Sequence, residues 1–205
     1  MGVLASLASG LLTGLTLIIA IGAQNAYVLR QGLLRAHVGP VVAVCAISDL
    51  VLIVAGVSGI GTVVEQAGWI LDVVRWLGVA FLTWYGVSSL LRARRPQGLE
   101  AARAGAPSLR AAVTTAVALT WLNPHVYLDT VLLLGSIANA QQSDQGGGRW
   151  WFTVGACAAS ILWFTALGYG ARLAERALAR PRAWRVLDVL IGLTMLAIAV
   201  KLASG

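Results

Sequence analysis

Apolar residues in this chain form long runs that are separated by short polar breaks. Six runs can be distinguished, at about residues 3–29, 39–61, 67–91, 110–139, 149–172 and 183–203. Each run is at least as long as the ~20 apolar residues that a helix needs to cross the hydrocarbon core of a bilayer. The pattern predicts an all-α integral membrane protein with six transmembrane helices. Because no basic region precedes the first run, we interpret it as a retained membrane helix and not as a signal peptide.

Composition supports the same class. The chain has 205 residues, of which 59% are hydrophobic and 11% are charged, and its mean hydropathy is +0.82. A soluble domain of this length needs far more polar surface. The breaks between the runs are too short for a further domain. We therefore expect residues 1–205 to form one transmembrane domain within the lipid bilayer.

The distribution of basic residues predicts the orientation. Most of them lie in the first, third and fifth loops, as Arg30, Arg35, Arg92, Arg94, Arg95, Arg103, Arg110, Arg172, Arg176, Arg180, Arg182 and Arg185. The other loops and the C-terminus hold Arg75, Arg149 and Lys201. Because short cytoplasmic loops are rich in Lys and Arg, the odd loops are predicted to be cytoplasmic and both termini periplasmic or extracellular. The net charge of +7 then reflects topology, and no nucleic-acid partner is expected.

The two halves of the chain resemble each other. The tetrapeptide "CAIS" at 45–48 recurs as "CAAS" at 157–160, and the glycines Gly56 and Gly168 follow at equal spacing. The tripeptide "LDV" also occurs once in each half, in the same order. The alternative explanation is chance similarity among small and aliphatic residues.

A repeat of this kind has a consequence for topology. Repeat one covers about residues 3–91 and repeat two about residues 110–203, with a cytoplasmic linker at about 92–109. Three spans per repeat reverse the orientation of the second copy. The sequence therefore predicts two inverted three-helix repeats, an arrangement found in many transporters.

Two of the predicted helices contain breaks. Pro124 interrupts the fourth helix, in "ALTWLNPHVYLDTVLLLG", and Asn123 precedes it. The first helix contains "IGAQN", in which Gly22, Gln24 and Asn25 form a matching polar break without a proline. Hydrocarbon cannot satisfy the backbone groups that a break frees, so such a break must face protein or water. We expect helices 1 and 4 to be interrupted near mid-membrane; the alternative is a simple proline kink that aids packing.

Two carboxylates fall inside apolar runs. Asp49 lies halfway along the second run, and Asp129 lies one turn beyond Pro124. The other acidic residues lie near predicted helix ends or loops and are expected to be solvated: Glu65, Asp72, Glu100, Asp144, Glu175 and Asp188. No Lys or Arg is predicted at the depth of Asp49 and Asp129. Unpaired carboxylates in a membrane favour a bound cation, a proton or both, and a structural ion pair is the alternative.

Other side chains near the breaks are weaker candidates. Tyr127 lies between His125 and Asp129, where its ring can make a cation–π contact with a substrate. The cysteines Cys45 and Cys157 form no CxxC pair, so no metal site and no cofactor is expected. An intramembrane enzyme is disfavoured, because the serines of the runs have no positioned histidine.

Four stretches together resemble a known family. "IGAQNAYVLRQG", "CAISDLVLIVAG", "GVAFLTWYG" and "TWLNPHVYLDTVLLLG" are similar to the LysE family of basic amino acid exporters, and most to its arginine exporter branch. The resemblance covers nearly the whole chain. It implies that Asp49 and Asp129 match acidic positions important for transport. The usual family pattern at the first break is G-P-Q-N, and Ala23 stands here in place of the proline.

The resemblance and the residues lead to one functional expectation. We expect a secondary transporter that exports L-arginine or L-lysine across the bacterial inner membrane by alternating access, with proton antiport as the coupling. The predicted substrate-binding or proton-coupling residues are Asp49, Asp129, Asn25, Gln24, Asn123 and Tyr127, and the predicted helix breaks are Gly22 and Pro124. The alternatives are an exporter of neutral amino acids or another small solute, a channel and an enzyme. A homodimer is compatible with the glycine-rich helix faces.

Overall fold

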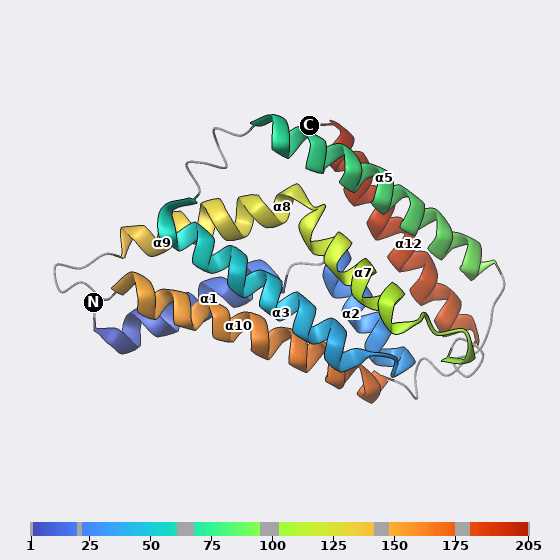
Figure 1. The fold of residues 1–205 in the computed structure, drawn as a ribbon. Coiled ribbons are helices and arrows are strands. Elements are labelled where there is room, and N and C mark those ends of the chain that lie inside the picture. Colours follow the sequence, from blue (N-terminus) through green and yellow to red (C-terminus); the bar gives the residue numbers. More distant parts are fainter. Residues whose placement is uncertain are drawn as a thin grey trace.

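A computed structural model of the protein describes residues 2–19, 22–60, 68–94, 103–141, 148–174 and 181–204. Within these ranges every regular element is a helix (Figure 1). The elements are α1 Val3–Ile18, α2 Ala23–Leu34, α3 Val38–Ala55, η1 Gly56–Ile60, α5 Gly68–Ala93, α7 Leu109–Trp121, α8 Pro124–Val126, η2 Tyr127–Leu133, α9 Leu134–Ala140, α10 Gly148–Gly170, η3 Ala171–Ala174 and α12 Pro181–Ser204. The segments η1 and η2 are π-helical, and η3 is a 3₁₀ helix.

The described helices account for up to six membrane spans. Four segments are long and apolar enough to cross a membrane by themselves: Val38–Gly59, Leu71–Ala93, Gly148–Ala174 and Pro181–Ser204. The other spans are bent pairs, α1 with α2 and α7 with the helix Pro124–Ala140. The order of the spans is the one predicted from the apolar runs. The prediction of an all-helical, multi-span membrane protein with interrupted first and fourth spans is therefore confirmed.

The outer surface of the helices is apolar. Large apolar side chains that are exposed on it include Leu12, Ile47, Trp84, Leu162 and Leu190, which come from five different helices. Exposing such side chains to water costs about 25 cal/mol for each Å² of apolar surface. Lipid removes this cost, so the surface suits a protein that is embedded in a bilayer.

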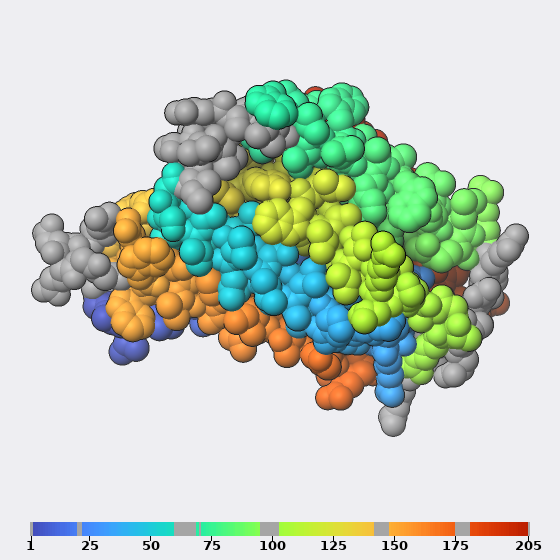
Figure 2. Space-filling view, viewed as in Figure 1, coloured from blue at the N-terminus to red at the C-terminus, as the bar shows by residue number. Residues whose placement is uncertain are grey.

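The second half of the first span and the first half of the fourth lie between two groups of helices. Helix α10 packs against α1 and α3, and α5 packs against α12 (Figure 1). Helices α2 and α7 each contact a member of both groups. Figure 2 shows α7 and α8 at the surface, between α3 and α5. The residues around the second break are partly buried, and those of the first break that the structure describes pack against neighbouring helices, so backbone groups freed there can find polar partners.

Glycines at equivalent positions of the two halves make equivalent close contacts. A Cβ atom on Gly56 would lie 2.5 Å from the carbonyl oxygen of Val131, and one on Gly135 would lie 2.6 Å from the carbonyl oxygen of Gly56. In the other half, a Cβ atom on Gly32 would collide with the carbonyl oxygen of Gly168. The glycines after "CAIS" and "CAAS" therefore each contact the later part of a broken span. Inverted repeats predict this correspondence.

The first span extends further than the apolar pattern predicts. Helix α2 continues to Leu34 and ends at Arg35, which has a left-handed conformation with a φ of 53°. The charge pattern places Arg30 in the first cytoplasmic loop, but this residue lies inside α2 and is buried. The predicted loop position of Arg30 is wrong. An arginine that follows an apolar run resembles the start of a loop, but the helix continues past it and buries Leu33 and Leu34.

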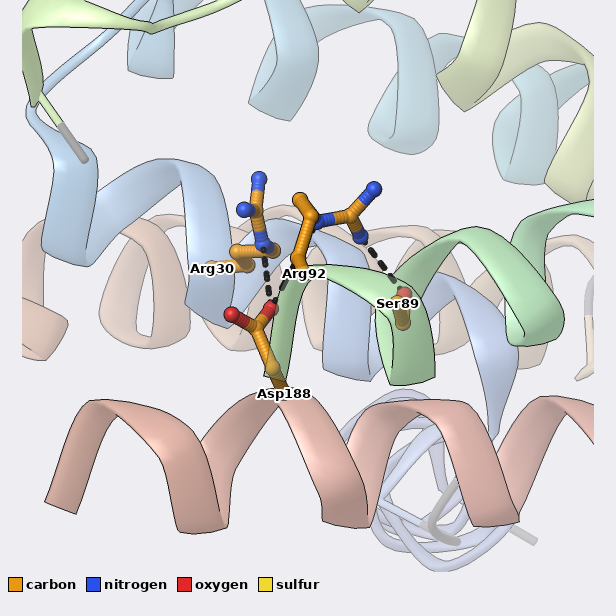
Figure 3. A network of polar contacts seen from close by, with 4 residues as sticks. All are labelled: Arg30, Ser89, Arg92 and Asp188. Carbon is orange, nitrogen blue, oxygen red and sulfur yellow. Dashed lines mark hydrogen bonds and ion pairs between the residues drawn. The ribbon is translucent and has the colours of Figure 1, made fainter. Parts of the chain in front are cut away.

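Arg30 belongs to a buried ion-pair network (Figure 3). Its Nε atom lies 3.4 Å from Oδ1 of Asp188, and the Nε atom of Arg92 lies 3.7 Å from the same oxygen. A terminal guanidinium nitrogen of Arg92 also donates to the hydroxyl of Ser89, at 2.6 Å. The network connects α2, α5 and α12.

The position of Asp188 corrects a second prediction. Its location close to the start of the last span predicts a solvated carboxylate, but Asp188 is only 3% exposed. It lies two turns into α12, where Arg30 of α2 and Arg92 of α5 contact it. Sequence distance from a helix end does not indicate which helices pack against that end.

Candidate functional site

The first break is formed without a proline. Helix α1 ends at Ile18, α2 begins at Ala23, and their axes differ in direction by 83°. Gly22 precedes α2 in an extended conformation. The side chain of Asn25 stabilises the break, because its Nδ2 donates to the carbonyl oxygen of Ile18 at 2.6 Å. Its Oδ1 accepts a hydrogen bond from Nε1 of Trp163 at 3.1 Å, which fixes the break against α10.

Pro124 forms the second break as predicted. It occupies the first turn of the helix that follows, a position where the missing N–H costs no hydrogen bond. Asn123 caps this helix, because its Oδ1 accepts from the backbone N–H of His125 at 3.1 Å. The hydroxyl of Tyr127 donates to the carbonyl oxygen of Trp121, the last residue of α7, at 2.9 Å. Side chains therefore satisfy backbone groups on both sides of the break, and the axes are bent by 60°.

The two breaks line one cavity of about 350 Å³. Its described lining residues are Leu17, Ile18, Gly22, Ala23, Gln24, Asn25, Asp49, Asn123, His125, Val126, Asp129, Thr130, Leu134, Phe164, Ile198 and Lys201. Both predicted carboxylates are among them, although 80 residues separate Asp49 from Asp129 in sequence. The volume lies at the lower end of the range for small-molecule pockets, about 300–1,000 Å³.

Asp49 occupies the deep part of the cavity. It lies on α3, is 5% exposed, and accepts a hydrogen bond through Oδ2 from the hydroxyl of Ser160 at 2.9 Å. Ser160 belongs to "CAAS" on α10, so a residue of the second half of the chain positions a carboxylate of the first half. The neighbouring Ser48 accepts from Nε1 of Trp121 at 3.0 Å. Because Ser160 leaves lone pairs of the carboxylate unused, Asp49 can accept further hydrogen bonds from a cationic ligand.

Asp129 and Gln24 each bring a polar side chain to the cavity. Asp129 lies in the π-helical segment η2 and is exposed. The side-chain nitrogen of Gln24 is buried beside the carboxylate of Asp49 and makes no hydrogen bond of standard geometry with the residues described. Leaving a buried donor unpaired costs roughly 1–3 kcal/mol. A ligand oxygen would remove this cost.

The structure separates the predicted site residues into two sets. Asp49, Asp129, Gln24, Asn25 and Asn123 line the cavity. Tyr127 is not among the described residues that line it. Its hydroxyl donates to the carbonyl oxygen of Trp121 at the end of α7, so in this structure Tyr127 holds the break together.

Ser160 and Lys201 are among the residues of the site that sequence reasoning missed. Ser160 holds Asp49 in place, and the alignment of "CAIS" with "CAAS" marks it as an equivalent of Ser48. Lys201 lines the cavity, although the charge pattern assigns it to the outer end of the last span. The local sequence gives no signal for the orientation of Lys201, because the orientation depends on how α12 is rotated about its axis.

Comparison with known proteins places this cavity in a functional context. The family model described as LysE type translocator matches residues 15–205. The chain belongs to the LysE family. The matched residues include both breaks and both cavity carboxylates. The resemblance to the LysE family that the four sequence motifs indicate is therefore confirmed. No solved structure matches the chain.

Named relatives of this LysE family protein are amino-acid exporters. The lysine exporter LysE of Corynebacterium efficiens is 38% identical, over 95% of this chain and 96% of its own length. The arginine exporter protein ArgO of Yersinia enterocolitica is 40% identical, over 98% of this chain and 97% of its own length. A Mycobacterium tuberculosis protein, named as a proposed amino-acid transporter, is 45% identical over 91% of this chain and 90% of its own length. These relatives support amino-acid export and point to a transporter rather than an enzyme.

Proposed function

We propose that this protein exports L-arginine and L-lysine from the cytoplasm. The observation that carries the proposal is the placement of Asp49 and Asp129 in one cavity between two interrupted helices. Carboxylates in a partly desolvated cavity attract a cationic side chain more strongly than they would in water. The names of the lysine and arginine exporters among its relatives agree with this chemistry.

We propose transport by alternating access, with the cavity closed on the predicted cytoplasmic side. On that side the hydroxyl of Tyr27 donates to the carbonyl oxygen of Ala112 at 3.2 Å, and the rings of Tyr27 and Tyr85 lie 5.9 Å apart. The ion pairs of Asp188 lie beyond these rings towards the cytoplasmic ends of α2 and α5. Reloading of substrate from inside would require α2 to separate from α5 and α12.

Export of a cation needs an energy source. A membrane potential that is negative inside opposes the export by about 2.3 kcal/mol per charge for each 100 mV. Proton antiport would offset this cost, because a carboxylate that has released the amino acid can return to the inside with a proton. Asp49 and Asp129 are the cavity carboxylates that can carry such a proton.

Counterflow in proteoliposomes tests the proposed function. Vesicles that contain the purified protein and unlabelled L-arginine should accumulate labelled L-arginine and L-lysine, and the uptake should saturate. Labelled L-leucine serves as the neutral control and should not accumulate. Accumulation of leucine with weak competition by arginine would instead support an exporter of neutral amino acids. Conductance without saturation would support a channel.

The proposed orientation also has a direct test. In a background without Cys45 and Cys157, we expect Ala104→Cys and Ser204→Cys to react with a membrane-impermeant thiol reagent from opposite sides. Both positions are exposed, so access to them depends on the side of the membrane and not on burial. In intact cells only Ser204→Cys should react; in lysed cells both should. Reaction of Ala104→Cys in intact cells would contradict cytoplasmic odd loops.

A further inference from the structure

The described lining of the cavity includes a positively charged residue, Lys201. Lys201 lines the cavity from the last turn of α12. Ile198, three residues earlier, lines the cavity as well. Residues three apart lie on the same face of a helix, so Lys201 belongs to the face of α12 that borders the cavity.

The charges around the cavity match those of a basic amino acid. Among the described lining residues, Asp49, Asp129 and Lys201 carry formal charges. L-arginine and L-lysine carry two cationic groups and one carboxylate at neutral pH. Two acidic groups and one basic group are therefore the complement of one substrate molecule. Lys201 forms no ion pair with any described residue, so its ammonium group is available to a ligand.

We propose that Lys201 binds the α-carboxylate of the exported amino acid and thereby selects amino acids against the corresponding amines. This inference rests on the proposed export of basic amino acids. Without a cation near it, the substrate carboxylate would face the two cavity carboxylates, and like charges repel each other. An ammonium–carboxylate contact replaces this repulsion with a charge-assisted hydrogen bond.

The burial of each charged residue indicates which group of the substrate it contacts. Asp49 is 5% exposed, whereas Asp129 and Lys201 are both exposed. The α-ammonium and the α-carboxylate sit on one carbon atom, so their partners belong to the same, more open part of the cavity. We assign Asp129 and Lys201, the two exposed charged residues of the lining, to these groups, and Asp49 is left for the side-chain cation. The substrate then lies with its side chain inward and its α-carbon towards the outer end of α12.

Competition by agmatine tests the proposal, because agmatine is L-arginine without the carboxylate. Reconstituted native protein should take up labelled L-arginine by counterflow, and agmatine should compete at least tenfold more weakly than unlabelled L-arginine. In Lys201→Gln the half-inhibitory concentration of L-arginine should rise about tenfold or more, which is the usual strength of a charge-assisted hydrogen bond. The half-inhibitory concentration of agmatine should stay unchanged. The ratio of the half-inhibitory concentrations of agmatine and L-arginine should therefore approach one.

Two further variants control for indirect effects. Lys201→Arg keeps the positive charge and should retain most of the preference for L-arginine. Arg149→Gln removes a cation that lies at the predicted outer side but does not line the cavity, and it should leave the ratio at its native value. Lys201 is exposed, so its substitution should not impair folding.

The competition experiment distinguishes failure of the proposed transport function from failure of the proposed role of Lys201. Failure of native protein to exchange L-arginine would refute the proposed function itself. Exchange of L-arginine with equal competition by agmatine would refute recognition of the carboxylate. Exchange with an unchanged ratio in Lys201→Gln would show that another group, such as the amide of Gln24, holds the carboxylate, and it would overturn the role of Lys201.

Discussion

Replacement of Asp49 with asparagine is expected to reduce L-arginine efflux by about tenfold to a hundredfold, because a hydrogen bond to a charged group contributes roughly 1.5–3 kcal/mol. The substitution preserves the shape of the side chain and removes its charge. Ser160 can still donate to the amide oxygen, as it now donates to Oδ2 of Asp49 at 2.9 Å. The variant should therefore insert and fold normally while it loses its attraction for the substrate cation.

The measurement is the initial rate of efflux at several external pH values, with protein levels determined in the same cells. Asp129→Asn should act in the same direction, but less strongly, because Asp129 is more exposed to solvent. Asp72→Asn provides the matched control: it is the same chemical change at an exposed carboxylate of α5 that does not line the cavity. Native rates and a native pH profile in both cavity variants would show that the carboxylates are structural and would refute the mechanism.

Replacement of Asp188 with asparagine is expected to destabilise the protein by about 3–5 kcal/mol, the usual cost of removing one partner from a buried ion pair. Arg30 is 9% exposed and would keep its charge without a counter-charge. Arg92, whose Nε lies 3.7 Å from Asp188, would then repel Arg30 instead of sharing a carboxylate with it. The contact of Arg30 with the ring of Trp184, at 6.0 Å, cannot replace an ion pair.

Thermal and denaturant unfolding in a fixed detergent should reveal the lower stability of Asp188→Asn. Arg92→Gln should lower the free energy of unfolding much less, because the side chain of Arg92 is 39% exposed and water can replace its contacts. The double variant Arg30→Met, Asp188→Leu should recover part of the stability, since a buried ion pair can often be replaced by apolar residues of similar volume. Equal stability of Asp188→Asn and native protein would show that the network contributes nothing to the fold. Activity measurements on the double variant would then test the proposed role of these ion pairs in closing the cytoplasmic side.

The sequence by itself determined the features that depend on local properties. Whether a segment of about 20 residues crosses a bilayer depends on its own hydropathy, so the six spans could be predicted. A proline interrupts its own helix in any environment, which made the break at Pro124 predictable. The carboxylate of Asp49 stood out because an acidic residue inside an apolar run is costly wherever the run packs. The matching break at Gly22 was found by analogy between the two halves.

Only the tertiary structure decided which residues of distant segments meet. Arg30 and Asp188 are 158 residues apart, and each alone has the sequence signature of a loop or a helix end. Ser160 could not be assigned to Asp49, and Lys201 could not be assigned to the cavity, because both assignments depend on how α10 and α12 are rotated about their axes. Tyr127 lies close to Asp129 in sequence, yet its hydroxyl bonds Trp121 at the break. Hydropathy places a helix in the membrane, but the direction of each polar side chain depends on packing between helices that the local sequence does not specify.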